Sequence, residues 1–189
     1  LGNLIIHKDI YDEFVAKLMD KVRSTRIGDS LEHEGVLYGS MLSEKYAKDF
    51  LEVIQMCEQD GATKLYGEGR ITSDNKPSGF VGTPEDGVFM WPHVYAGVTE
   101  DMRCFHEEMF GPAITLVKAD DFEHGLHLAN ASPYGLSSAI YTNDRLEAYR
   151  FKTGIKAGMT GINNSTTGAE AHLPFCLLYT SDAADEGWW

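Results

Sequence analysis

The chain has 189 residues, of which 43% are hydrophobic and 24% are charged, and a formal net charge of −13. This length and composition predict one globular domain with a sizeable core. The acidic charge argues against a nucleic-acid partner, because phosphate binding needs clustered Lys and Arg. No apolar run approaches the roughly 20 residues that cross a bilayer, and no signal peptide is visible. We therefore expect a cytoplasmic protein without a membrane partner.

The cysteines and histidines give no sign of a disulfide framework or a metal site. Cys57, Cys104 and Cys176 are far apart in the sequence, which fits a reducing compartment. His124 and His127 have the spacing to touch one metal ion, but no third ligand is apparent. We expect no metal.

The first third of the chain is typical of a strand followed by two helices. LGNLIIH, at 1–7, has the character of a strand. Apolar residues at helical spacing then predict a helix over 10–24 with Asp9 as its N-cap: Ile10, Phe14, Leu18 and Val22. A second helix is predicted over 43–59, beginning at Ser43 and ended by Asp60-Gly61, with an apolar face made of Tyr46, Phe50, Ile54 and Cys57.

Further strands follow from residue 64. Residues 64–66 predict a short strand, 67–87 a loop or irregular hairpin, and 88–95 an apolar, aromatic strand. Strands and helices then alternate, with strands predicted at 113–117, 137–141 and 159–163 and helices at 122–130 and 145–156. Asp120-Asp121 should cap the helix at 122–130, whose inward residues are Phe122, Leu126 and Ala129. This alternation is typical of right-handed crossovers in one parallel sheet. The predicted class is α/β, a mostly parallel twisted sheet with flanking helices.

The end of the chain breaks this order. Residues 176–189, CLLYTSDAADEGWW, have neither helical nor strand periodicity. The run 176–186 looks like the in-frame translation of a transposon adapter used in sequencing libraries. We therefore expect a domain over 1–175 and a non-native tail over 176–189, with a genuine, variable C-terminal tail as the alternative.

Three segments resemble the aldehyde dehydrogenase superfamily in its order and spacing. They are IIHKDIYDEFVAKL at 5–18, HEEMFGPAITLVK at 106–118, and ANASPYGLSSAIYTND at 129–144 followed by GINNSTTGAEAHLPF at 161–175. The resemblance covers 1–175 and implies much of the catalytic domain of an NAD(P)-dependent, non-acylating enzyme. Its cofactor would be NAD or NADP, its substrate a small aldehyde, and the parent protein a homodimer or homotetramer.

The EEMFGP segment carries the predicted cofactor contacts. Gly111-Pro112 precedes a strand, which places Glu108 and Phe110 on a loop at the sheet edge, where α/β proteins bind ligands. A carboxylate can accept hydrogen bonds from both ribose hydroxyls, and an aromatic ring can pack on a nicotinamide. The resemblance implies these roles for Glu108 and Phe110, respectively. From spacing alone, the simpler interpretation is that Glu107 and Glu108 only cap or solvate a loop.

The stretch after the last predicted strand carries the predicted substrate contacts. The resemblance implies that Asn164, Ser165 and Thr166 line the aldehyde tunnel, with Phe175 near its wall. Small hydroxyl side chains favour a polar or short substrate, such as a semialdehyde or a small hydroxyaldehyde. An ordinary Gly-containing loop explains the same residues equally well.

No catalytic residue is expected within this sequence. Cys104 lies close to His106 and Glu108 and could suggest a thiol with its base, but its position is not a catalytic one in the family. The resemblance places the cysteine that forms the thiohemiacetal and thioester a few residues upstream of Leu1, and the general base also upstream. The chain alone should be inactive. Two alternatives stay open: a non-catalytic relative of the same fold, and an acylating relative that uses coenzyme A.

Overall fold

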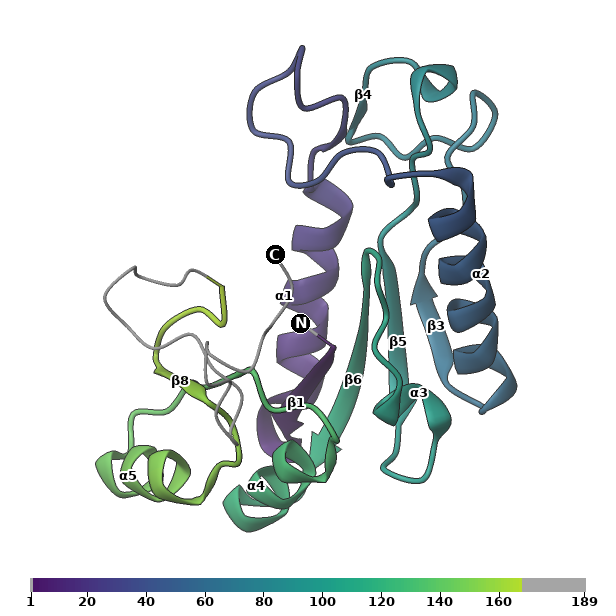
Figure 1. The fold of residues 1–189 in the computed structure, drawn as a ribbon. Helices are drawn as coiled ribbons and strands as arrows, with labels where there is room; N and C mark the ends of the chain where they lie inside the picture. The colour runs from purple at the N-terminus through teal and green to yellow at the C-terminus, as the bar shows by residue number, and fades with distance from the viewer. Residues whose placement is uncertain (1, 168–189) are drawn as a thin grey trace, which may run out of the picture. The chain divides into compact units, whose positions relative to one another are not determined.

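The computed structural model describes residues 2–167, and its chain forms two compact units, Leu1–Lys118 and Ala119–Trp189 (Figure 1). The strands are β1 (Asn3–His7), β2 (Ile27–Gly28), β3 (Thr63–Tyr66), β4 (Phe80–Val81), β5 (His93–Val98), β6 (Ala113–Ala119), β7 (Ser137–Ile140) and β8 (Met159–Ile162). The helices are α1 (Tyr11–Ser24), α2 (Glu44–Gln59), α3 (Arg103–His106), α4 (Phe122–Ala131) and α5 (Arg145–Gly154), with short 3-10 turns η1 (Lys8–Ile10) and η2 (Pro84–Asp86).

A four-stranded sheet in the order β1-β6-β5-β3 forms the centre of the first unit. β5 and β6 are parallel, whereas β3 and β5 are antiparallel. Side chains alternate between the two faces of a strand, and β5 shows which helix covers which face. Val94 packs in a core cluster with Met19 of α1. Its neighbours His93 and Tyr95 instead meet Phe50 and Glu58 of α2. The two long helices therefore cover opposite faces of the sheet. With the parallel pairs β2–β4 and β7–β8, this confirms the α/β class with mostly parallel pairing.

Helix α1 follows the predicted range, but its start and its buried face were predicted wrongly. Asp9 lies inside η1 and is not the N-cap of α1; Ile10 holds that position without a side-chain cap. Ile10 is 53% exposed and Phe14 37%. The face that packs on the sheet is rotated from the predicted one and comprises Tyr11, Val15, Leu18, Met19 and Val22.

Helix α2 also has the predicted bounds, with one error in its apolar face. Tyr46 is 44% exposed, and Ala47 takes the buried position beside it. Phe50, Ile54 and Cys57 are buried as expected. Asp60 ends the helix, and Gly61, at φ 95°, adopts the left-handed backbone that favours glycine.

The region between α2 and β5 contains more structure than a loop. β4 pairs in parallel with β2, so that Ile27 lies opposite Phe80, a pairing absent from the sequence prediction. A second core cluster forms under it from Ile27, Ile71, Phe89 and Trp91. The strand predicted at 88–95 was wrong in its first half, because β5 begins at His93 and Met90 makes only an isolated bridge.

The second unit contains a compact β7–α5–β8 crossover with parallel strands, as the alternating pattern predicts. Asp121 caps α4 by accepting a hydrogen bond from the N–H of His124 at 2.9 Å. The buried residue of α4 is Leu128, whereas the predicted inward residues Phe122, Leu126 and Ala129 are only half-buried. β6 pairs with β5 in the four-stranded sheet, and β7 and β8 pair with each other in parallel.

Candidate functional site

The loop at 107–112 connects α3 to β6 and carries both predicted cofactor contacts. It begins where the N–H of Glu107 donates to the carbonyl of Arg103 at 3.0 Å. Arg103 pairs with the Asp60 carboxylate at 2.7 Å, and the N–H of Cys104 donates to the same carboxylate at 3.1 Å. Burial raises the pKa of Asp60, but these hydrogen bonds outweigh it and hold the pKa below its ordinary value. Through α3, these hydrogen bonds hold the start of the loop against the end of α2.

Glu108 and Phe110 lie exposed on this loop, in agreement with the placement expected from the sequence. The ring of Phe110 is 71% exposed, and Glu108 is also exposed. No hydrogen bond or ion pair joins the Glu108 carboxylate to another residue in the part of the chain that the structure describes. A free carboxylate near an uncovered ring is suited to a ligand that carries hydroxyl donors and a flat heterocycle. The cofactor roles of the two residues stay predictions.

The end of the loop is held by a close approach of two segments. A Cβ atom added to Gly111 would overlap the ring of Phe50, so no side chain fits at this position. Phe50 is 2% exposed and meets His93 edge-on, with ring centroids 5.5 Å apart. The N–H of His93 donates to the carbonyl of Pro112 at 2.7 Å. Helix α2 and strand β5 therefore fix where the loop enters β6.

The cysteines of the described residues are buried and are not arranged as nucleophiles. Cys57 is 0% exposed and Cys104 1%. The neighbouring Cys104 thiol and burial both raise the pKa of Cys57, which favours its protonated form. Nε2 of His106 lies 2.7 Å from the carbonyl of Glu100. The three neighbours Cys104, His106 and Glu108 thus form no thiol–base–acid chain.

The predicted substrate residues Asn164, Ser165 and Thr166 follow β8 in the second unit. Asn164 and Ser165 are exposed, and the Asn164 side chain accepts from the N–H of Ser165 at 2.8 Å. The sequence predicted Asn163 only as the end of a strand, but the residue adopts a left-handed backbone at φ 52°. Its side chain bonds both the N–H and the carbonyl of Thr142, each at 3.0 Å. An Asn at the end of a strand could have indicated this turn from the sequence, because Asn adopts the left-handed conformation more readily than most residues. Phe175 lies outside the described residues, as does the tail from Cys176.

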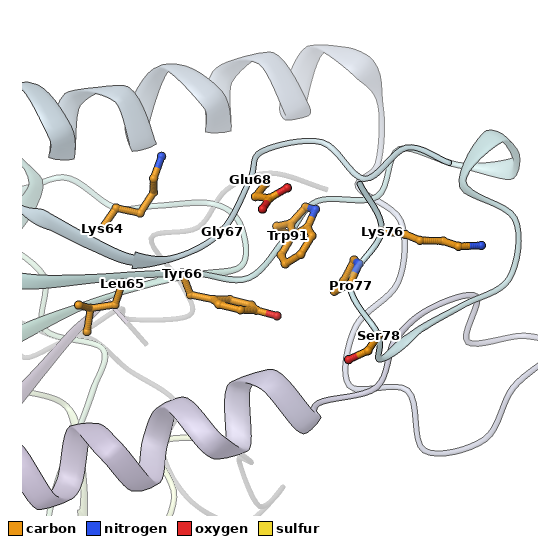
Figure 2. A pocket seen from close by; sticks show the side chains of 9 residues that line it. All are labelled: Lys64, Leu65, Tyr66, Gly67, Glu68, Lys76, Pro77, Ser78 and Trp91. Carbon is orange, nitrogen blue, oxygen red and sulfur yellow. The ribbon is translucent and has the colours of Figure 1, made fainter. Parts of the chain in front are cut away.

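A separate hollow of about 640 Å³ lies in the first unit, between the segments 64–68 and 76–78. Figure 2 shows the indole of Trp91 between these two segments. Nε1 of Trp91 is buried and has no hydrogen-bond partner among the residues that the structure describes. None of the predicted site residues lines this hollow.

His124 and His127 form no metal centre within residues 2–167, where no group of three or more His, Cys, Asp or Glu side chains could hold an ion. His124 instead accepts a hydrogen bond from the N–H of Asp120 at 3.2 Å. No helix in the described range is long and apolar enough to cross a membrane.

Comparison with known proteins identifies the family of the chain. The pattern of the "Aldehyde dehydrogenase family" matches residues 1–177. The chain is 40% identical over 171 residues to alpha-ketoglutarate semialdehyde dehydrogenase of Haloferax volcanii, covering 90% of this chain and 33% of that protein. It is 36% identical to succinate-semialdehyde dehydrogenase [NADP(+)] of Deinococcus radiodurans, covering 91% of this chain and 33% of that protein.

The fold agrees with this similarity. The structure of betaine aldehyde dehydrogenase from Staphylococcus aureus in complex with NAD+ superposes with a TM-score of 0.83 at 26% identity, covering 93% of this chain and 33% of that one. The chain belongs to the aldehyde dehydrogenase family. It spans about a third of the length of the relatives that it matches. The resemblance stated from three sequence motifs is thereby confirmed.

Proposed function

We propose that this chain is a segment of the catalytic domain of an enzyme that oxidises an aldehyde to a carboxylic acid with NAD+ or NADP+. Residues 1–175 would form this segment, with 176–189 foreign to it. The observation that carries the proposal is the exposed carboxylate of Glu108, which has no partner within residues 2–167, near the exposed ring of Phe110 on a loop entering a strand of the sheet. Family membership and the NAD+ complex of the Staphylococcus relative support it.

In this proposal the loop at 107–112 binds and orients the cofactor. Glu108 accepts hydrogen bonds from the ribose hydroxyls, for which its two oxygens are available. Phe110 packs against the nicotinamide and limits its rotation, because stacking on a flat ring fixes its pose. A nicotinamide held by Glu108 and Phe110 would supply the hydride acceptor for the reaction. The residues of this segment hold that ring in place and exclude water from one of its faces.

The cysteine that attacks the aldehyde lies outside this segment in our proposal. The reaction needs an accessible thiolate, which adds to the aldehyde to form a thiohemiacetal. Loss of a hydride to NAD+ or NADP+ and of a proton would convert it to a thioester, which water then cleaves to release the acid and the thiol. Cys57 and Cys104 are too deeply buried for an aldehyde to reach. The complete enzyme would supply this thiolate and the general base, and we expect it to be a cytoplasmic homodimer or homotetramer.

Asn164, Ser165 and Thr166 contribute to the aldehyde pocket in this proposal. Their amide and hydroxyl groups favour a short, polar substrate, because a long apolar chain would leave such groups without hydrogen-bond partners. The two curated relatives described above are both named for semialdehydes. We therefore propose a semialdehyde as the substrate class.

Substitution of Glu108 in the complete enzyme tests the proposal. Glu108→Gln keeps the size of the side chain but removes its charge, and it should weaken cofactor binding and slow turnover by on the order of 1–3 kcal/mol. Glu107→Gln is the matched control, since Glu107 is exposed on the same loop. Cofactor affinity from fluorescence titration and turnover with a semialdehyde are the measurements. Equal values for both variants and the parent enzyme would reject the cofactor role.

A further inference from the structure

Met109, the residue between Glu108 and Phe110, contacts helix α2, whereas its two neighbours are exposed to solvent. Met109 is half-buried, and its Sδ atom lies 4.0 Å from the Sγ atom of Cys57 on α2. Cys57 itself is fully buried and donates to the carbonyl of Val53 at 3.5 Å, so it offers a fixed surface. Thioethers fill such irregular apolar gaps well.

The backbone geometry explains why Glu108 and Phe110 face solvent when the side chain of Met109 faces α2. In an extended segment successive side chains point to opposite sides. The N–H of Gly111 donates to the carbonyl of Met109 at 2.9 Å, which closes a three-residue turn with Phe110 at its apex. Exposure follows this pattern, since Glu108 and Phe110 are exposed while Met109 is half-buried.

We propose that Met109 is a positioning residue: its side chain, seated beside Cys57, holds Glu108 and Phe110 outward as a preformed surface for the cofactor. This inference rests on the proposed function of that loop. Three contacts fix the loop. The backbone N–H of Glu107 bonds the carbonyl of Arg103 at its start, and the side chain of Met109 contacts Cys57 in the middle. At its end the backbone of Gly111 packs against the ring of Phe50. The two outward side chains lie between these contacts. A loop held in this way loses little conformational entropy when a ligand binds.

Three variants of the complete enzyme test the role of Met109. Met109→Ala should raise the dissociation constant for NAD(P)+ by about fivefold, because the loop must then be ordered on binding. Met109→Leu keeps an apolar side chain of similar volume and should stay within about twofold of the parent. Cys57→Ala removes the same contact from the other side and should resemble Met109→Ala, and Glu107→Gln again serves as the matched control. Amide hydrogen exchange of residues 108–111, measured on the 189-residue chain, should accelerate in Met109→Ala and Cys57→Ala only.

A combined variant shows whether Met109 acts through its neighbours. Against a background of Glu108→Gln with Phe110→Ala, a further Met109→Ala should leave the dissociation constant unchanged, because the groups that it positions are already lost. A further loss in that background would overturn the positioning role. So would unchanged affinity in both Met109→Ala and Cys57→Ala while Glu108→Gln still weakens binding. If Glu108→Gln itself has no effect, the proposed cofactor role fails and this inference fails with it.

Discussion

The backbone N–H of Gly69 donates a hydrogen bond to Nε2 of His93 over 3.2 Å, so this nitrogen carries no proton. The proton of the neutral ring is therefore on Nδ1, which lies 2.8 Å from the carbonyl of Trp91. His93 is 2% exposed, and its burial lowers its pKa to about 4. A protonated ring would lose the hydrogen bond from Gly69 and place a charge in the core between α2 and β5.

Acid should therefore destabilise the chain through His93. The ordinary pKa of 6.5 applies to the unfolded chain, which takes up a proton between pH 6.5 and about 4 that the folded chain does not. The contribution of His93 to stability is complete above pH 6.5 and is lost as the pH falls to about 4, by at most about 3 kcal/mol. Urea unfolding at about pH 7 and about pH 4.5 measures this loss, which His93→Gln should reduce. His33→Gln serves as the control, and an equal reduction in both variants would contradict the assignment.

Gly111→Ala should destabilise the fold by about 1–3 kcal/mol, because the added methyl group overlaps the buried ring of Phe50. Phe50→Leu in the same molecule should recover part of this loss, since the smaller side chain leaves room for the methyl group. Gly2→Ala is the control, as an added Cβ there meets no atom within 4 Å. Denaturant unfolding of Gly111→Ala, Phe50→Leu, the double variant and Gly2→Ala gives the free energies. Strictly additive losses would show that the ring and residue 111 do not compete for the same space.

Asp60→Asn should lower the free energy of unfolding by about 1–3 kcal/mol, because Arg103 loses its charged partner and the N–H of Cys104 a charged acceptor. Asp49→Asn on the same helix should cost less than about 1 kcal/mol, since Asp49 is exposed and its nearest cation is 3.8 Å away. Both values come from urea unfolding near neutral pH. If Asp60→Asn is as mild as Asp49→Asn, the Asp60 carboxylate does not hold α3 against α2.

The purified 189-residue chain should produce no reduced cofactor from small aldehydes and NAD(P)+. Its described cysteines are buried, so that no thiolate is available to the substrate. Absorbance of the reduced nicotinamide over several hours checks this. Reduction of the cofactor that disappears in Cys104→Ala would overturn both this expectation and the non-catalytic assignment of Cys104.

Much of this fold could be predicted because its elements have strong local signals. The bounds of α2 follow from its apolar repeat and from Asp60-Gly61, and the β7–α5–β8 crossover follows from alternating patterns. The errors occur where long-range packing decides. The buried face of α1 is the one that packs against Val94 and Leu116 of the sheet, and β4 exists because Phe80 meets a distant strand at Ile27. Neither contact leaves a periodic trace in the sequence.

For the candidate site, too, local features could be predicted from the sequence and long-range contacts could not. Glu108 and Phe110 could be placed on a loop because Gly111-Pro112 precedes a strand. The attachment of that loop could not be predicted, because Met109 and Cys57 are far apart in sequence and each looks like ordinary core. Asp60 was recognised only as the end of a helix, although its carboxylate also fastens α3. Pairwise contacts of this kind emerge only once the chain is folded.

The close approach of Gly111 to Phe50 also constrains how related sequences can diverge. The ring from α2 occupies the volume that any side chain at position 111 would need. Replacing Gly111 therefore costs stability unless position 50 has first become smaller, and a lineage that keeps an aromatic ring at position 50 gains stability by keeping glycine at 111. A single contact between a helix and a loop thus makes one order of the two mutations less destabilising than the other.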